Sequence, residues 1–489
     1  MAGSPTIKPF TAEETYRIVH HLQEPAVFLN MTCGWPVLHW TVDHLSGCLG
    51  NKHVRFRLGR KKKINVNPTA PLFETHCSFV DATLAQFLSW TQGHSGTHDG
   101  PFCDYPSSEY WAYADYKYIS QLLEDQPSMF EDVKWSEFGF EGRDGRESTL
   151  WIGTEGANTP CHLDSYGCNL VLQVQGRKCW HLFPPEDAAK LYPTRIPYEE
   201  SSVFSQVNVL QPDLRRFPAF QRARTHSVTL EPGQVLYVPR HWWHYVESVD
   251  PVTVSVNSWI ELEADDVARV SEAVTKAVVC ALKTTPADDN ADVWLNPTED
   301  GVSSHNENMQ YVNLAVRACA QRLRGHSQST RDSQAVKRDC SGRVKRCGDC
   351  VPFTVPFGPH LIPVYAQQEP KGMNPNDPEV KSIRKCVIRS QLDCAESSEA
   401  AQRTDPASAV RIHRGQHECG SALSHCGEEM AEDNEGSGHA TITTNDLLDC
   451  LVHPDIIMRV TELLLQRHTD QTTAACELEY SPNRKTLPH

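Results

Sequence analysis

Residues 235–246 read Val-Leu-Tyr-Val-Pro-Arg-His-Trp-Trp-His-Tyr-Val. The first four residues are typical of a strand, the proline predicts a turn, and the residues from Trp242 onward predict a second strand. Because side chains alternate along a strand, Trp242, His244 and Val246 are expected on one face and Trp243 on the other. The segment therefore predicts two consecutive β-strands, the second of which carries a histidine on the same face as Trp242.

Short runs of the same kind recur along the first half of the chain, at residues 54–58, 170–174 and 252–256. They are strand-like in length and in β-branched content. Apolar residues at helical spacing predict a helix at 12–23, and a shorter helix is expected at 119–123. We therefore expect one mainly β domain with surrounding helices over residues 1–262.

The rest of the chain changes character twice. Residues 263–325 have apolar residues at helical spacing and predict a helix pair, which is also where we would expect a homodimer contact. Ser, Gln, Asp, Pro and Gly dominate residues 326–443, which predicts a largely disordered linker. Residues 444–489 predict short C-terminal helices and a tail, with Pro454 in the first turn of the second helix.

Composition narrows the classes of function. The 489 residues carry a formal net charge of −16, which argues against a protein that coats nucleic acid, because phosphate binding needs a positive field. No apolar run approaches the ~20 residues that span a bilayer, and the N-terminus lacks the apolar core of a signal peptide. We therefore expect a cytoplasmic protein without membrane contact.

Two histidines and one carboxylate stand out as candidate metal ligands. In Thr159-Pro160-Cys161-His162-Leu163-Asp164, strand alternation places His162 and Asp164 on one face. His244, about 80 residues further on, could supply a third ligand, with His241 as its competitor. Two imidazoles and a carboxylate form the facial triad that binds non-haem Fe(II). A pair of structural histidines is the alternative.

Lys178 is a candidate for holding an anionic co-substrate. It lies in Gly176-Arg177-Lys178-Cys179-Trp180, an apolar strand in which a buried lysine is costly. Arg177 has the opposite parity and is expected in solvent. A 2-oxo acid with a distal carboxylate would need such a buried cation, whereas a surface lysine is the alternative.

These motifs, in this order, resemble the JmjC (cupin) family of Fe(II)- and 2-oxoglutarate-dependent oxygenases, and in particular its small members such as the tRNA wybutosine hydroxylase. The similarity covers about residues 25–265 and implies a double-stranded β-helix. Four segments match the family. They are residues 35–40, the segment 159–164 with His162, the lysine-bearing strand at 176–185, and residues 231–244, which are the most specific match.

The resemblance also implies roles for individual residues. His162, Asp164 and His244 would bind Fe(II), which leaves positions for 2-oxoglutarate and O₂. Lys178 and Thr159 would hold the distal carboxylate of 2-oxoglutarate. The remaining candidates are Tyr113, which competes with Tyr110, Tyr116 and Tyr118 for a hydroxyl contact to that carboxylate, and Asn169, Asn257 and Trp259 near the metal-bound end.

The implied function is a hydroxylase acting on an unknown protein side chain, in a protein that associates with a small heat shock protein of the 27 kDa class during cellular stress. The main alternative is a non-catalytic interaction protein with the same partner. RNA hydroxylation and histone demethylation are less supported. The stretch between Asp164 and Gly176 is one residue longer than in the related asparaginyl hydroxylase, and Ser165-Tyr166-Gly167-Cys168 occupies the part that shapes substrate access there. This puts the substrate, not the iron chemistry, in doubt.

Overall fold

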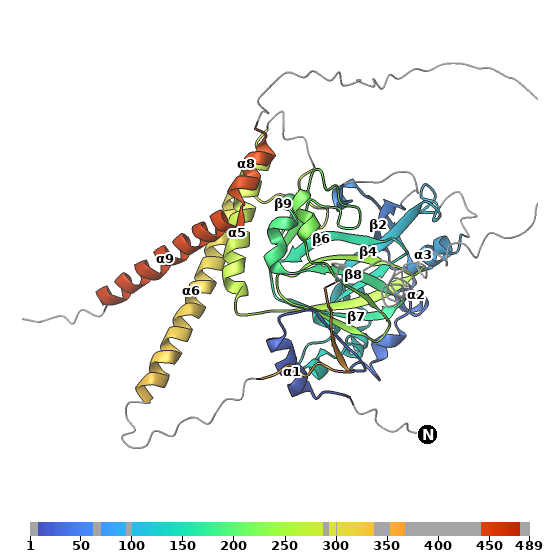
Figure 1. Ribbon diagram of the computed structural model, residues 1–489, viewed down its shortest axis with the longest axis horizontal. Coiled ribbons are helices and arrows are strands. Elements are labelled where there is room, and N and C mark those ends of the chain that lie inside the picture. Colours follow the sequence, from blue (N-terminus) through green and yellow to red (C-terminus); the bar gives the residue numbers. More distant parts are fainter. Residues whose placement is uncertain are drawn as a thin grey trace, which may run out of the picture. The chain divides into compact units, whose positions relative to one another are not determined.

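The structure is a computed structural model, and its description covers seven ranges of the chain (Figure 1), namely residues 8–61, 70–93, 100–286, 293–299, 301–336, 353–366 and 442–479. Apart from Ile442, these residues belong to one compact unit. The architecture below refers to them alone.

Two antiparallel sheets form the β domain. The larger sheet has nine strands, in the order β15 (Leu361–Pro363), β1 (Ala26–Phe28), β12 (Val235–Val238), β7 (Cys168–Gln175), β14 (Thr253–Ile260), β5 (Thr149–Gly153), β4 (Tyr110–Tyr118), β2 (Val54–Arg60) and β3 (Ser78–Ala82). The smaller sheet has six, in the order β11 (His226–Leu230), β8 (Lys178–Phe183), β13 (Trp243–Ser248), β6 (Asn158–Asp164), β10 (Ser202–Ser205) and β9 (Pro193–Glu199).

The chain passes repeatedly from one sheet to the other. The strands β5, β7, β12 and β14 lie in the larger sheet, and β6, β8 and β13, which fall between them in sequence, lie in the smaller one. This alternation is the double-stranded β-helix that the family resemblance implies. The predicted fold class is therefore confirmed.

The alternation of side chains along β13 sorts its residues between two apolar clusters. Trp242, at the turn before β13, and Val246 pack in one cluster with Trp180, whereas Trp243 and Tyr245 pack in another. The predicted parity is confirmed. It leaves the imidazole of His244 on the same face as Trp180, with the two ring centroids 5.8 Å apart.

Short helices pack on the larger sheet. They are α1 (Ala12–His21), α2 (Val42–Leu49), α3 (Leu84–Thr91) and α4 (Ile119–Leu122). The first begins with a capping box between Thr11 and Glu14, which satisfies backbone donors that a helix start leaves free. Helices α1, α2 and α3 pack in the main core cluster through Ile18, Leu45 and Phe87, respectively.

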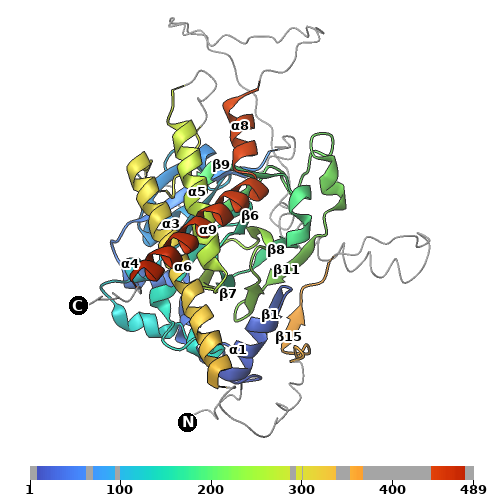
Figure 2. The same ribbon diagram turned by 90° about the vertical axis from the view of Figure 1, so that its left-hand side faces the viewer.

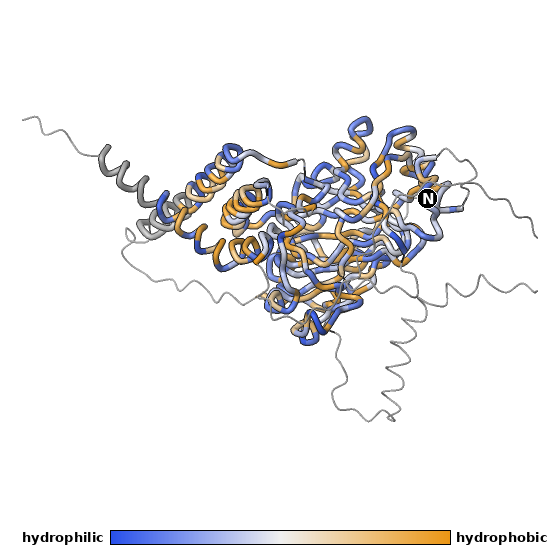
Figure 3. The backbone as a smooth tube through the Cα atoms, turned by 90° about the horizontal axis from the view of Figure 1, so that it is seen from above, coloured by the Kyte–Doolittle hydropathy of each residue, from blue (hydrophilic) through white to orange (hydrophobic). Residues whose placement is uncertain are grey.

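A helical extension follows the β domain (Figure 2), with helices α5 (Asp265–Lys283), α6 (His305–Val336), α8 (Thr444–Leu451) and α9 (Pro454–Glu479). Hydrophobic and hydrophilic residues alternate along these helices (Figure 3), as amphipathic packing requires. One face of α5 packs through Val274 against Leu448 and Ile457, and another packs through Val270 against Val312 of α6. The C-terminal helices thus pack back on α5. None of the helices in the described ranges is both long and apolar enough to cross a membrane.

The predicted linker over residues 326–443 needs correction at its start and in its interior. Helix α6 continues to Val336, and β15 pairs with β1 inside the region expected to be disordered. Leu361 and Val364 are buried there in two different clusters. The burial of these two side chains stabilises a strand that the prolines of the segment disfavour. Pro363 is tolerated because β15 is an edge strand. The remainder of the predicted linker lies outside the described residues.

Candidate metal centre

His162, Asp164 and His244 converge between the two sheets. Neighbouring strands β6 and β13 supply them, and His162 lies directly opposite His244 in the pairing register. One ligand atom from each residue lies within 4.8 Å of the other two. The Nε2 atoms of His162 and His244 are 3.7 Å and 4.0 Å from the two carboxylate oxygens of Asp164. His241, the competitor, lies at the turn with a positive φ of 63° and is not part of this group.

Backbone contacts orient both imidazoles. Nδ1 of His162 lies 2.8 Å from the carbonyl oxygen of Pro160, and Nδ1 of His244 lies 3.0 Å from that of Trp242. A carbonyl can only accept, so Nδ1 carries the proton in each ring and Nε2 keeps its lone pair. Both lone pairs are therefore available to a metal on the side of Asp164.

The carboxylate of Asp164 is held by an indole. Nε1 of Trp259 on β14 donates a hydrogen bond of 2.9 Å to its Oδ2. Outer contacts of this kind fix the orientation of metal-binding carboxylates. The sequence placed Trp259 near the metal-bound end without identifying this contact.

Burial keeps the imidazole of His162 neutral. Burial and the neighbouring His244 lower the pKa of His162 to about 4, while Asp164 acts in the opposite direction. A neutral imidazole is the form that binds metal ions. The electrostatics of His162 therefore agree with its hydrogen bonding.

Lys178 lies fully buried on β8. Its Nζ donates to Oγ of Ser255 at 2.7 Å and to the hydroxyl of Tyr113 at 3.2 Å, and no carboxylate of the described residues lies within ion-pair distance. Burial lowers its pKa to about 7, with Asp115 acting in the opposite direction. An ammonium group without a carboxylate in a polar pocket is suited to receive an anion. Arg177, as expected, is exposed and pairs with Asp250.

The tyrosine alternatives separate in the structure. Tyr113 reaches Lys178, and its hydroxyl also bonds with Thr159. Tyr110 packs against Tyr105 outside the pocket, and Tyr118 is largely exposed. Tyr116 lines the pocket but contacts Trp151 and Trp259 instead of Lys178.

A pocket of about 710 Å³, counted out to its mouth, contains these groups. The residues to which the resemblance assigns a role all line it: Tyr113, Thr159, His162, Asp164, Asn169, Lys178, His244, Asn257 and Trp259. Asn169 and Asn257 are buried, and in the described structure their Oδ1 atoms have no hydrogen-bond partner. They are polar groups that a bound molecule could satisfy.

The sequence did not identify the acidic side of the pocket. Glu74, Asp115 and Glu199 line it as well. A completely buried arginine, Arg57 on β2, lies 2.8 Å from Asp115 and 3.9 Å from Glu74. Burial raises the pKa of Glu74 to about 7, although Arg57 acts to lower it. The alternating run Val-Arg-Phe-Arg-Leu at 54–58 carried no signal for this burial, because Arg57 has the parity opposite to Val54 and Phe56 and would be expected in solvent.

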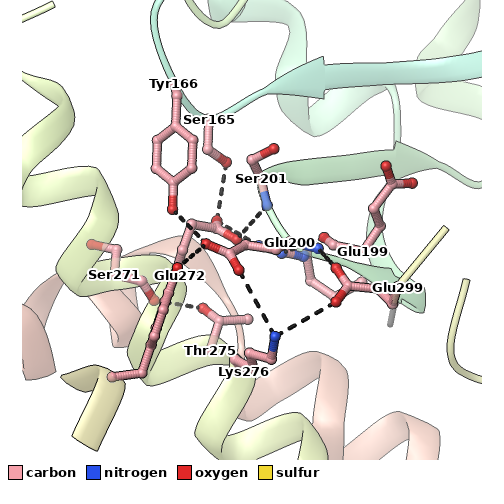
Figure 4. Close-up of polar contacts among 12 residues, drawn as sticks. Ser165, Tyr166, Glu199, Glu200, Ser201, Ser271, Glu272, Thr275, Lys276 and Glu299 are labelled. Atoms are coloured by element: carbon pink, nitrogen blue, oxygen red, sulfur yellow. Dashed lines mark hydrogen bonds and ion pairs between the residues drawn. The ribbon is translucent and has the colours of Figure 1, made fainter. Parts of the chain in front are cut away.

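A second cavity of about 1130 Å³ adjoins the pocket and shares Glu74, Asp115, Tyr116, Glu199 and Thr298 with it. Glu200 and Glu299 line its outer part, and Lys276 of α5 lies between them at 3.8 Å and 3.5 Å (Figure 4). The helical extension therefore contacts the approach to the metal centre.

Comparisons with known proteins agree with this geometry. The model of a cupin-like domain family matches residues 12–266. The HSPB1-associated protein 1 homolog of Danio rerio is 57% identical over 466 residues, which cover 95% of this chain and 99% of that protein. HSPB1-associated protein 1 of Homo sapiens is 48% identical over 483 residues, which cover 94% of each. The tRNA wybutosine-synthesizing protein 5 of Gallus gallus is 29% identical over 265 residues, which cover 53% of this chain and 78% of that protein.

Proposed function

The chain belongs to the cupin-like domain family, and from this premise we propose that it is an Fe(II)- and 2-oxoglutarate-dependent hydroxylase of JmjC type that acts on a protein side chain. One observation carries the proposal: two imidazoles with free Nε2 atoms and one carboxylate meet within 4.8 Å. Two histidines and a carboxylate with open positions are the donor set of non-haem Fe(II) oxygenases.

The residues fit this metal. His162 and His244 would bind it through Nε2 and Asp164 through a carboxylate oxygen, while the carbonyls of Pro160 and Trp242 keep the rings in the required tautomer. Trp259 would keep the Asp164 carboxylate in place. When bound, the iron supplies the oxidative chemistry, in which O₂ and 2-oxoglutarate are consumed and succinate and CO₂ are released.

The other half of the pocket fits 2-oxoglutarate. Lys178 would pair with the distal carboxylate, and the hydroxyls of Tyr113 and Thr159 would donate to its oxygens. Binding would give Lys178 the counter-ion that it lacks in the described structure. Asn169 and Asn257 would contact the metal-bound end of the molecule.

Turnover of 2-oxoglutarate tests the proposal. The purified full chain with Fe(II) should form succinate, at least slowly without a substrate, and His162→Ala should not. Equal inactivity of the two proteins with iron demonstrably bound to wild type would contradict it. Mass spectrometry of trapped substrates then separates the alternatives, since a gain of one oxygen on a protein indicates hydroxylation, a loss of methyl groups indicates demethylation, and a modified tRNA indicates an RNA substrate.

A second function, association with a small heat shock protein of the 27 kDa class, is proposed from the relatives. Proteins that match nearly the whole chain carry HSPB1 association in their names. This role is compatible with catalysis, and alone it would make the chain an interaction protein. Direct binding to the purified small heat shock protein would test it. The cytoplasmic location and the homodimer contact through residues 263–325 stay predictions.

A further inference from the structure

The loop that follows the ligand Asp164 is attached to the helical extension. Strand β6 ends at Asp164, and β7 begins at Cys168, so only Ser165, Tyr166 and Gly167 connect them. The loop lies in the stretch between Asp164 and Gly176, which is one residue longer than in the related asparaginyl hydroxylase. Its contacts therefore decide how the carboxylate ligand and Asn169, just beyond the loop, are held.

Glu272 of α5 is the main attachment point. Its Oε1 accepts a hydrogen bond of 3.0 Å from Oγ of Ser165, and its Oε2 accepts one of 3.0 Å from the backbone N–H of Ser201 (Figure 4). Arg195 of β9 donates to both oxygens, at 2.8 Å and 2.7 Å. Glu272 is only 5% exposed, so one buried carboxylate joins the loop, the turn before β10 and β9.

A second carboxylate of α5 holds the other end of the loop. Oδ1 of Asp265 accepts a hydrogen bond of 3.0 Å from the N–H of Gly167. Gly167 has a φ of 61°, and a Cβ there would lie 2.4 Å from the carbonyl oxygen of Ile260. The loop is thus closely packed as well as hydrogen-bonded, and it has little freedom to shift without α5.

The electrostatics favour a charged Glu272. Burial acts to raise its pKa, but Arg195 and the donors Ser201 and Ser165 lower it below its ordinary value. A buried ion pair is weak evidence for added stability, because both charges lose their hydration. The role of Glu272 is therefore better inferred from its hydrogen bonds to the loop than from its ion pair with Arg195.

We propose that Glu272 is a positioning residue of the metal centre: through Ser165 it fixes the loop that begins directly after Asp164, and so determines how tightly the centre holds its metal. The inference rests on the proposed function, because it concerns the same ligand set. Groups hydrogen-bonded directly to metal ligands commonly change metal affinity by about 10–100-fold when removed, and Glu272 acts one step further out, through Ser165.

Co(II) binding to the metal-free full chain, followed by absorption or calorimetry, tests the proposal. Ser165→Ala removes the contact to Glu272 and leaves the ion pair with Arg195 in place. We expect it to weaken Co(II) binding by about 10-fold or more and to speed hydrogen exchange of the backbone amides of residues 163–169. Ser165→Thr keeps a hydroxyl and should restore both properties.

Two further variants separate positioning from general stability. Glu272→Gln should weaken Co(II) binding as well, but it leaves Arg195 without its carboxylate and is expected to lower stability too. Asp266→Asn is the matched control, since Asp266 lies on α5 and pairs with Arg322 of α6 at 3.2 Å. It should bind Co(II) like wild type.

Failure of this inference and failure of the proposed function give different results. If wild type binds Co(II) and Ser165→Ala binds it equally well, the positioning role is overturned and the metal centre stands. If wild type itself binds no Co(II), the proposed metal centre is overturned, and the role of Glu272 falls with it. Weaker binding accompanied by faster exchange over the whole β domain would also overturn the proposal, because it would indicate a merely structural role.

Discussion

Lys178 places a titratable ammonium in the interior of the β domain. Burial lowers its pKa to about 7 from the ordinary 10.5. Between these values the unfolded chain binds a proton that the folded chain does not, so stability rises with pH across this window and levels off below pH 7. The lysine therefore costs stability at neutral pH until an anion binds beside it.

Replacing this lysine tests that cost. From pH 7.5 to 9.5 its contribution should raise the free energy of unfolding of the ligand-free wild type by about 2–3 kcal/mol, from about 1.4 kcal/mol per pH unit. Lys178→Met should lack this increment and lose 2-oxoglutarate turnover. Urea unfolding at both pH values measures the increment. The exposed neighbour variant Arg177→Met should keep it, and an increment retained in Lys178→Met would contradict the assignment.

Trp259 offers a test of the ligand orientation. Trp259→Phe removes the hydrogen bond of 2.9 Å to Asp164 but keeps an aromatic ring against Tyr116 and Trp151. Co(II) affinity should fall by about 10-fold. In the control Trp151→Phe, the lost hydrogen bond goes to Thr149, away from the ligands. Co(II) affinity of Trp259→Phe equal to that of wild type would show that the indole does not orient Asp164.

Individual residues could be placed from the sequence where strand parity governs them. His162 and Asp164 followed from alternation, whereas the choice of His244 over His241 and the role of Lys178 came from the family resemblance. Glu74 and Glu199 could not be placed in this way, because they reach the pocket from a short helix and from β9, far along the chain from the motifs. Only the pairing of β9, β10 and β6 brings Glu199 near Asp164.

At the scale of elements, the contribution of β15 to the stability of the fold can be measured. Leu361 is fully buried in the main core, whereas Ile362 next to it is largely exposed. Leu361→Ala should lower the free energy of unfolding by about 2–5 kcal/mol through lost burial and a cavity. Ile362→Ala should cost less than about 1 kcal/mol. Similar costs for the two, from urea unfolding, would contradict the docking of this strand.

Elements in which apolar residues recur at a regular spacing were predictable. Elements that form only by pairing with a segment far away in the sequence were not. The helix expected at 12–23 is observed at Ala12–His21, and the first helix of the pair expected over 263–325 is observed at Asp265–Lys283. The segment 353–366 has no period of its own and several prolines. Its strand exists because the edge of β1 supplies hydrogen bonds and a place for Leu361. Local propensity carries no information about such a partner.

At the scale of the whole molecule, the structure sharpens the test for partner binding. A deletion of residues 326–489 would also remove β15 and the helices that pack on α5, so loss of binding would be ambiguous. Replacing residues 367–441 by a Gly/Ser linker of equal length leaves those elements intact. Loss of binding to the small heat shock protein in a pull-down would assign the contact to residues 367–441. Retained binding would assign the contact to the β domain or its helices.

The strand β15 also has a consequence for biosynthesis. The backbone N–H of Leu29 donates to the carbonyl of His360, and the side chains of Asn30 and His360 meet across 330 residues of sequence. At ~5–20 residues per second, about 17–66 s of translation separate the two partners. Once β12 has paired with the other side of β1, 122 residues before His360, the outer edge of β1 presents unpaired backbone groups for about 6–24 s, and such groups can template association with another chain. The newly made β domain therefore has an interval of exposure to aggregation that ends only when residues 360–364 leave the ribosome, and it is in this interval that a chaperone would have most to protect.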